Sequence, residues 1–108
     1  MRKTTEEIEQ ELVSLKEKYP KSKSFIITEE DGSTITLILK PIDRIIYERS
    51  LIISEKSGIE ASVYLIDKLW IGGDDKALVL NDDENLIAAN HTLGALYKSK
   101  TAELKKNY

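Results

Sequence analysis

The chain has no cysteine, one histidine, one tryptophan and two prolines among its 108 residues. The lack of cysteine excludes a disulfide framework, a thiolate metal site and a cysteine nucleophile. No apolar run approaches the roughly 20 residues of a membrane-spanning helix, and no apolar region typical of a secretory signal follows the N-terminus. We therefore expect an unprocessed protein of the cytosol without a membrane partner.

The chain also has little excess of either sign of charge. The 16 Lys and Arg residues and 19 Asp and Glu residues leave a formal net charge of -3. Nucleic-acid-binding domains usually carry a basic face, so this balance argues against a nucleic-acid partner. The hydrophobic content of 41% is sufficient for a packed core, and the length suits one domain. The composition thus indicates a single small globular domain, residues 1–108.

The first 20 residues predict an amphipathic helix from Thr4 to Lys18. Its apolar residues recur at helical spacing on one narrow stripe, at Ile8, Leu12, Leu15 and Tyr19. Thr4 followed by Glu7 matches a capping box, and Pro20 ends the helix. Because the other faces are charged, this helix either packs on its own domain or stands partly detached and docks on a partner.

Residues 24–40 predict a β-hairpin, because two segments rich in β-branched residues flank Asp31 and Gly32. Asp-Gly is typical of a two-residue type I′ turn, which would pair Thr28 with Ile35. In that register one face carries Ile26, Ile35, Leu37 and Leu39, and the opposite face carries Phe25, Ile27 and Ile38. Since both faces are apolar, the N-terminal helix or another chain must cover the second face.

Residues 41–106 predict a helical part with three helices. Pro41 has no N–H and suits the first position of a helix that ends at Gly58. A second helix runs from about Ile59 to Ile71, and Gly72 and Gly73 end it.

The last helix begins at three capping residues, Asn81, Asp82 and Asp83, whose carboxylates complement the helix dipole. Its apolar positions continue from Leu86 to Leu104. The sequence therefore predicts an α+β fold in a single domain, with an N-terminal helix, one β-hairpin and then three helices.

Two sets of polar residues are candidates for a chemical site. Carboxylates close in sequence could bind a hard cation, at Asp74, Asp75, Asp82, Asp83 and Glu84. Their spacing lacks the ligand order of an EF-hand loop, and helix capping accounts for their positions. His91 has no acidic neighbour, and no serine lies in a nucleophile motif. We expect no catalytic residue, no metal site, no cofactor and no enzymatic activity.

A series of motifs resembles small tailed-phage and prophage proteins of the tail assembly chaperone type. These motifs follow the hairpin and are Lys40-Pro41-Ile42-Asp43-Arg44, Leu69-Trp70-Ile71-Gly72-Gly73-Asp74, Leu86-Ile87-Ala88-Ala89 and Lys100-Thr101-Ala102-Glu103-Leu104-Lys105-Lys106. The resemblance covers residues 24–106. It implies a small non-catalytic α/β protein that binds tape-measure or tail-tube components during phage assembly.

We therefore expect a non-enzymatic assembly protein of the bacterial host cytoplasm that self-associates and binds a phage tail or virion protein. The expected partner-binding residues are Phe25, Ile27, Ile38 and Trp70. Tryptophan is enriched both in binding hot spots and in cores, so both roles stay open for Trp70. The alternatives are a minor head, neck or tail accessory protein that remains in the virion, and a small oligomeric regulatory binding module.

Overall fold

The computed structural model describes residues 2–93 and confirms the α+β single domain. Its elements in chain order are α1 (Thr5–Lys18), β1 (Lys23–Thr28), β2 (Thr34–Leu39), α2 (Arg44–Ser54), α3 (Gly58–Leu69), β3 (Trp70–Gly73), α4 (Ala77–Leu80) and α5 (Asp83–Thr92). The three strands form one antiparallel sheet in the order β1-β2-β3. The third strand and the short helix α4 are additions to the predicted elements.

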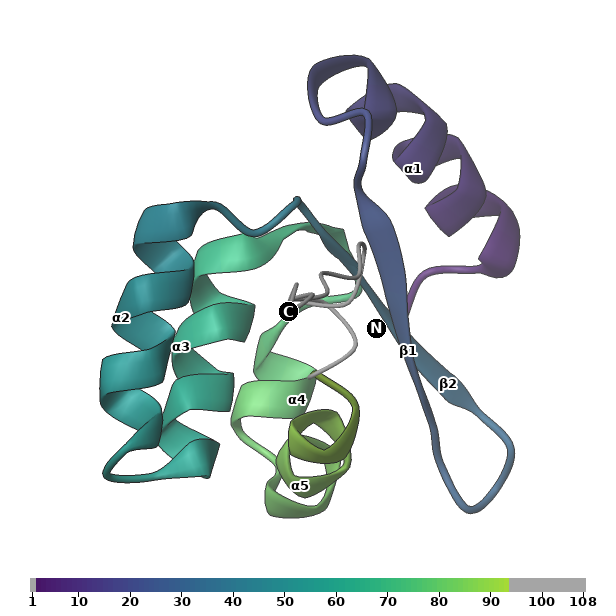
Figure 1. Ribbon diagram of the computed structural model, residues 1–108. Helices are drawn as coiled ribbons and strands as arrows, with labels where there is room; N and C mark the ends of the chain where they lie inside the picture. Colours follow the sequence, from purple (N-terminus) through teal and green to yellow (C-terminus); the bar gives the residue numbers. More distant parts are fainter. Residues whose placement is uncertain (1, 94–108) are drawn as a thin grey trace, which may run out of the picture.

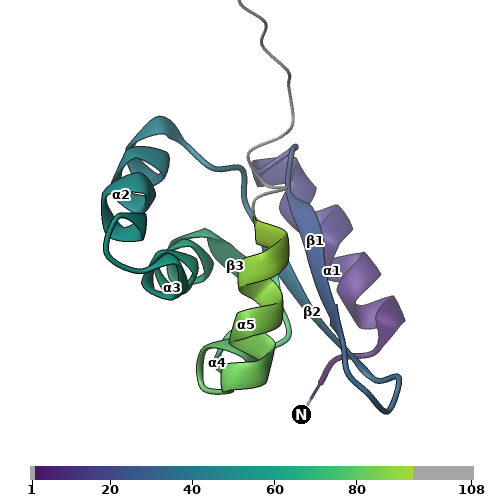
Figure 2. The ribbon, with the colours of Figure 1, turned by 60° about the horizontal axis from the view of Figure 1, so that its bottom comes forward.

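The sheet separates α1 from all the other helices (Figures 1 and 2). Helices α3 and α5 lie on one face of the sheet, and α2 packs on the outer side of α3. The main core fills the space between this face and the helices and includes Leu37, Ile66, Leu69 and Val79, all fully buried. No helix within residues 2–93 is long and apolar enough to cross a membrane.

Helix α1 begins with the predicted capping box. The Glu7 N–H donates to Thr4 Oγ1 at 3.2 Å, and the Thr4 N–H donates to Glu7 Oε1 at 3.2 Å. The helix lies across the second face of the sheet and packs closely against β3, so that a Cβ atom at Gly72 would lie 2.8 Å from Leu15 Cδ1. The second apolar face of the sheet is thus covered over β3 and Ile38 by this helix of the same chain.

The predicted hairpin exists, but its predicted turn and register are wrong by one residue. Thr28 pairs with Thr34 instead of Ile35, and the Glu29 N–H donates to Ser33 O at 2.8 Å. Only Gly32 in the turn has a positive φ, of 85°, and its N–H donates to Glu29 O. Asp31 thus keeps a negative φ, and the loop has three residues with glycine in the left-handed position.

A register shift of one residue moves side chains to the opposite face of a strand. Phe25 therefore pairs with Leu37, and Ile27 pairs with Ile35, on the face that meets the main core. Ile26, predicted on the same face as Ile35, Leu37 and Leu39, lies on the opposite face and is 58% exposed. Phe25 and Ile27 thus share a face with Ile35 and Leu37, whereas the type I′ turn would place them on the opposite face.

The prediction that Gly72 and Gly73 end a helix that runs to Ile71 is also wrong. Helix α3 ends at Leu69, and the chain continues as β3, in which Gly73 pairs with Leu37 and Gly72 pairs with Ile38. The edge of β2 accepts this strand because β2 is buried on both faces and needs partners on both sides. Glycine fits here because a side chain would meet α1 at Gly72 and the β2 backbone at Gly73.

Two further helix boundaries differ from the prediction. Pro41 lies before α2, whose N-cap is Asp43, with the Ile46 N–H donating to Asp43 Oδ1 at 2.8 Å. Gly58 does not end α2 and is the first residue of α3, with Ser57 as its N-cap. The side-chain oxygen of a serine or aspartate accepts a hydrogen bond from a backbone N–H in the first turn of the helix, and proline and glycine have no such oxygen.

The predicted start of the last helix is confirmed. Asp82 is the N-cap of α5, and its Oδ1 accepts from the Asn85 N–H at 3.0 Å. The predicted continuation to Leu104 and the motif Lys100–Lys106 lie outside the described residues.

We predict that Gly73→Ala destabilises the domain more than Gly32→Ala. Both glycines have a φ near 85°, which costs an alanine about 1 kcal/mol. A Cβ at Gly73 would also lie 3.0 Å from Ile38 N and closer still to Thr36 O, whereas Gly32 has open space. Urea unfolding followed by circular dichroism should show that the free energy of unfolding falls by about 1 kcal/mol in Gly32→Ala and by about 2–4 kcal/mol in Gly73→Ala. Equal losses would show that β3 does not pack against β2 at this residue.

Candidate functional site

Three of the four predicted partner-binding residues are buried. Phe25 and Ile27 belong to the main core, and Ile38 lies on the second face of the sheet with no exposed area. They face the interior because β3, α1 and α5 cover the hairpin within the same chain. In this conformation they are not accessible to a partner, and a role in binding would require the sheet to open.

Trp70, the fourth, is half-buried and packs against the main core. Its indole Nε1 donates to Asp74 O at 2.9 Å. Lys76 Nζ lies 5.5 Å from the centre of the ring, within cation–π distance. The side chain therefore holds the chain segment that follows β3, and only part of the ring is open to solvent.

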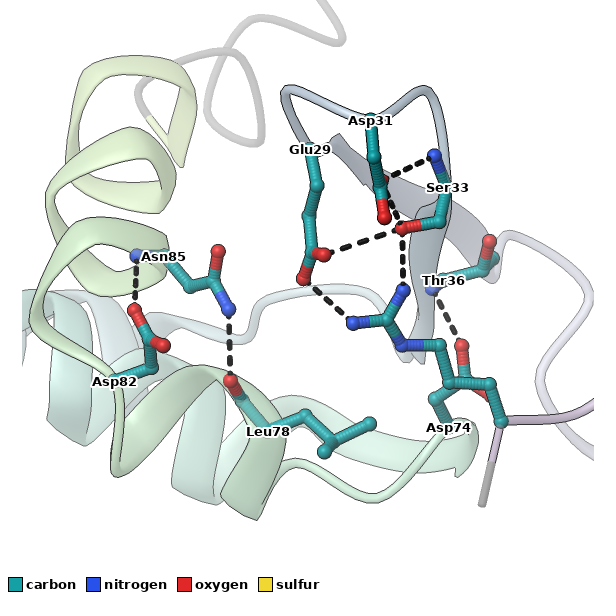
Figure 3. Close-up of polar contacts among 9 residues, drawn as sticks. Glu29, Asp31, Ser33, Thr36, Asp74, Leu78, Asp82 and Asn85 are labelled. Atoms are coloured by element: carbon teal, nitrogen blue, oxygen red, sulfur yellow. Dashed lines mark hydrogen bonds and ion pairs between the residues drawn. The ribbon is translucent and has the colours of Figure 1, made fainter.

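Asp74 is the most deeply buried carboxylate among the described residues, with 1% of its surface exposed. Oδ1 accepts from the Lys3 N–H at 2.7 Å. Oδ2 accepts from the Thr36 N–H at 2.9 Å (Figure 3). The Asp74 N–H in turn donates to Thr36 O at 2.7 Å. We call these residues, with Trp70, the Asp74 junction. It ties the start of the chain to the central strand.

The remaining candidate carboxylates of the sequence analysis take part in separate local contacts. Asp75 Oδ1 accepts from the Ala77 N–H at 2.9 Å, Asp82 caps α5, and Asp83 and Glu84 lie in its first turn. Within residues 2–93, no group of three or more His, Asp or Glu residues is placed to hold a metal ion. His91 is exposed in the last turn of α5. Of these candidates the structure brings only Asp82 and Glu84 to one surface cleft.

Sequence reasoning missed the apolar surface of α2. Ile45, Leu51 and Ile52 are all exposed, and Ile52 keeps 64% of its surface. Ile45 and Ile52 are seven residues apart and lie on one side of the helix, and Leu51 lies about 100° around the helix from Ile52. We call these three exposed residues the α2 face. A signal was present: the pairs Ile45-Ile46 and Leu51-Ile52 supply more apolar residues than one buried stripe uses.

Two surface hollows of opposite charge lie at the two ends of β1. A basic cavity of about 500 Å³ is lined by Lys16, Lys21, Lys23 and Lys40 around an apolar floor. An acidic cleft of about 410 Å³ is lined by Glu29, Glu30, Asp31, Asp82 and Glu84. Charged side chains of one sign converge in each hollow, and neither lining includes a residue of the opposite charge.

The acidic cleft includes the hairpin turn, in which hydrogen bonds hold the carboxylates of Glu29 and Asp31 (Figure 3). The hydrogen bond from Ser33 Oγ to Asp31, 2.6 Å long, lowers the pKa of that carboxyl group. Arg2 donates to Glu29 Oε1 at 2.6 Å and to Ser33 Oγ at 2.8 Å. Arg2 thus forms an ion pair with Glu29, and its charge also helps to lower the pKa of Asp31, although no described cation forms a direct ion pair with Glu30 or Asp31.

Comparison of this chain with protein-family models, with curated proteins and with solved structures finds no match.

We predict that Asp74→Ala destabilises the domain by about 2–4 kcal/mol, because it leaves the buried Thr36 N–H without its acceptor. Asp74→Asn should cost less, since one amide oxygen can still accept. Asp83→Ala is the control, an exposed carboxylate of the α5 first turn whose loss should cost about 0.5 kcal/mol. Urea unfolding at pH 7 measures all three. Equal stability of the two alanine variants would contradict the structural role of the Asp74 junction.

Proposed function

We propose that this protein is a non-enzymatic assembly protein of a tailed phage or prophage, which binds a tail component as tail assembly chaperones do. The motifs in residues 24–106 suggest the class of protein, through their resemblance to that family. The observation that carries the binding role is the α2 face, where three large aliphatic side chains remain exposed on one helix.

The placement of α2 supports binding through this face. Helix α2 packs against α3 and is the helix farthest from the sheet (Figures 1 and 2). Large exposed apolar side chains that cluster on one surface are typical of protein–protein contacts. Burial of three such side chains at an interface removes apolar area from water, which favours association.

A tail assembly chaperone acts before the particle is complete and leaves it. We therefore expect the protein in host cell extracts in complex with a tape-measure or tail-tube protein, and not in purified particles. Mass spectrometry of both fractions distinguishes this function from that of a minor head, neck or tail accessory protein, which would remain in the particle. A small regulatory module of the host would not be in complex with a tail protein in either fraction.

We predict that the double substitution I45E/I52E reduces co-purification with the co-expressed tail component at least about tenfold, because it puts charge where the partner packs. The free energy of unfolding should change by less than about 0.5 kcal/mol, since both side chains are exposed. Val13→Glu is the matched control, because Val13 on α1 is 69% exposed and lies across the sheet from α2. Undiminished binding by I45E/I52E would contradict the proposed surface.

A further inference from the structure

Strand β1 forms one edge of the sheet, and no described strand pairs with its outer side. The Glu29 N–H donates to Ser33 O, and bonded residues alternate along an antiparallel ladder, so Phe25 and Ile27 also bond toward β2. On the other side of β2, Thr36, the neighbour of Ile26, directs both its N–H and its C=O to Asp74. The backbone groups of Ser24, Ile26 and Thr28 therefore point outward.

This pattern allows a second copy of β1 to add antiparallel to the first. The hydrogen-bonded pairs between the two strands then consist of residues whose backbone groups point outward. In the register centred on Ile26, the twofold axis passes between Ile26 and Ile26 of the second copy. Ser24 then pairs with Thr28 of the second copy. The exposed Ile26 side chains would lie next to each other on the second face of the sheet.

The same register brings unlike charges together. Lys23 comes opposite Glu29 of the second copy, which would then lie between Lys23 and its own Arg2. Lys21 comes close to Asp31 of the second copy, which forms no direct ion pair with a described cation. The basic cavity of each copy thereby approaches the acidic cleft of the other, and the symmetry repeats the contact at the opposite end of β1. Opposite charges on facing strands favour pairing.

We propose that two copies of this chain form a symmetric dimer through their β1 edges, with Ile26 at the twofold axis, which joins the two sheets into one of six strands. A second copy fits this edge better than an unrelated strand, because its own sequence supplies the matching charge at both ends. The inference deepens the proposed function and rests on it, since the dimer would present two α2 faces to a tail component.

The first test is the mass of the full chain by sedimentation equilibrium. We expect a dimer whose dissociation constant rises at least about tenfold in Ile26→Lys, which places two like charges at the axis. Val13→Lys is the control, with a similarly exposed side chain on α1, and should dimerise as the native chain does. A native chain that stays monomeric up to about 0.5 mM overturns the proposal.

A second test addresses the charges. K21E/K23E should weaken the dimer at least about tenfold, whereas K56E/K68E, with the same net charge and both residues outside the basic cavity, should not. The native dimer should also weaken when NaCl rises from about 0.05 to about 1 M. Equal weakening by both double variants would show that net charge alone acts, and would overturn the pairing of the basic cavity with the acidic cleft.

A third test fixes the geometry, because the native chain has no cysteine. Two Ile26 residues in a bonded pair have Cα atoms about 5.5 Å apart, which suits a disulfide. Ile26→Cys should therefore cross-link to a dimer under mild oxidation, and Ile52→Cys on α2 should stay monomeric in the same conditions. Cross-linking of Ile52→Cys in preference to Ile26→Cys would place the interface on α2 and overturn the proposal.

The outcomes separate this inference from the proposed function. A monomeric chain that still binds a tail component through the α2 face overturns the β1 dimer alone. A β1 dimer that binds no tail component overturns the assembly function alone.

Discussion

The pairing of β3 with β2 is the constraint on which the rest of the structure depends. Strand β2 is buried on both faces and has a strand on each side, and its second partner exists only because Gly72 and Gly73 let the chain approach so closely. Gly72 gives α1 room to pack on the second face, and Gly73 turns the chain so that Asp74 reaches Thr36. The Asp74 junction then fixes the start of the chain through Lys3, and the Gly73 N–H donates to Glu11 in the middle of α1, so the helix is held against β3.

That constraint also decides what remains for binding. The apolar residues of the hairpin, except Ile26, are buried, so they stabilise the domain and are not available at the surface. Apolar area stays exposed on α2, which packs mainly against α3, and no strand within residues 2–93 pairs with the outer edge of β1. The proposed partner and the proposed second copy thus use different surfaces and could be bound at the same time.

Local signals predicted the fold well where a short sequence decides the outcome. The capping box at Thr4 and the N-cap at Asp82 depend on residues within one turn, and the hairpin depends on two β-branched segments around a glycine. The turn type was wrong because Asp-Gly is compatible with more than one loop. A three-residue loop with glycine in the left-handed position places Phe25 and Ile27 in the core, which burial of the whole sheet favours.

The sequence by itself determined the α+β class, the start of α1 and of α5, and the absence of cysteine chemistry, because these follow from composition and nearest neighbours. Only the tertiary structure decided that Gly72 and Gly73 form a strand, that Asp74 is a buried acceptor and that Ile26, Ile45 and Ile52 are exposed. Each of these outcomes depends on contacts between segments far apart in the chain, which no local pattern of residues records.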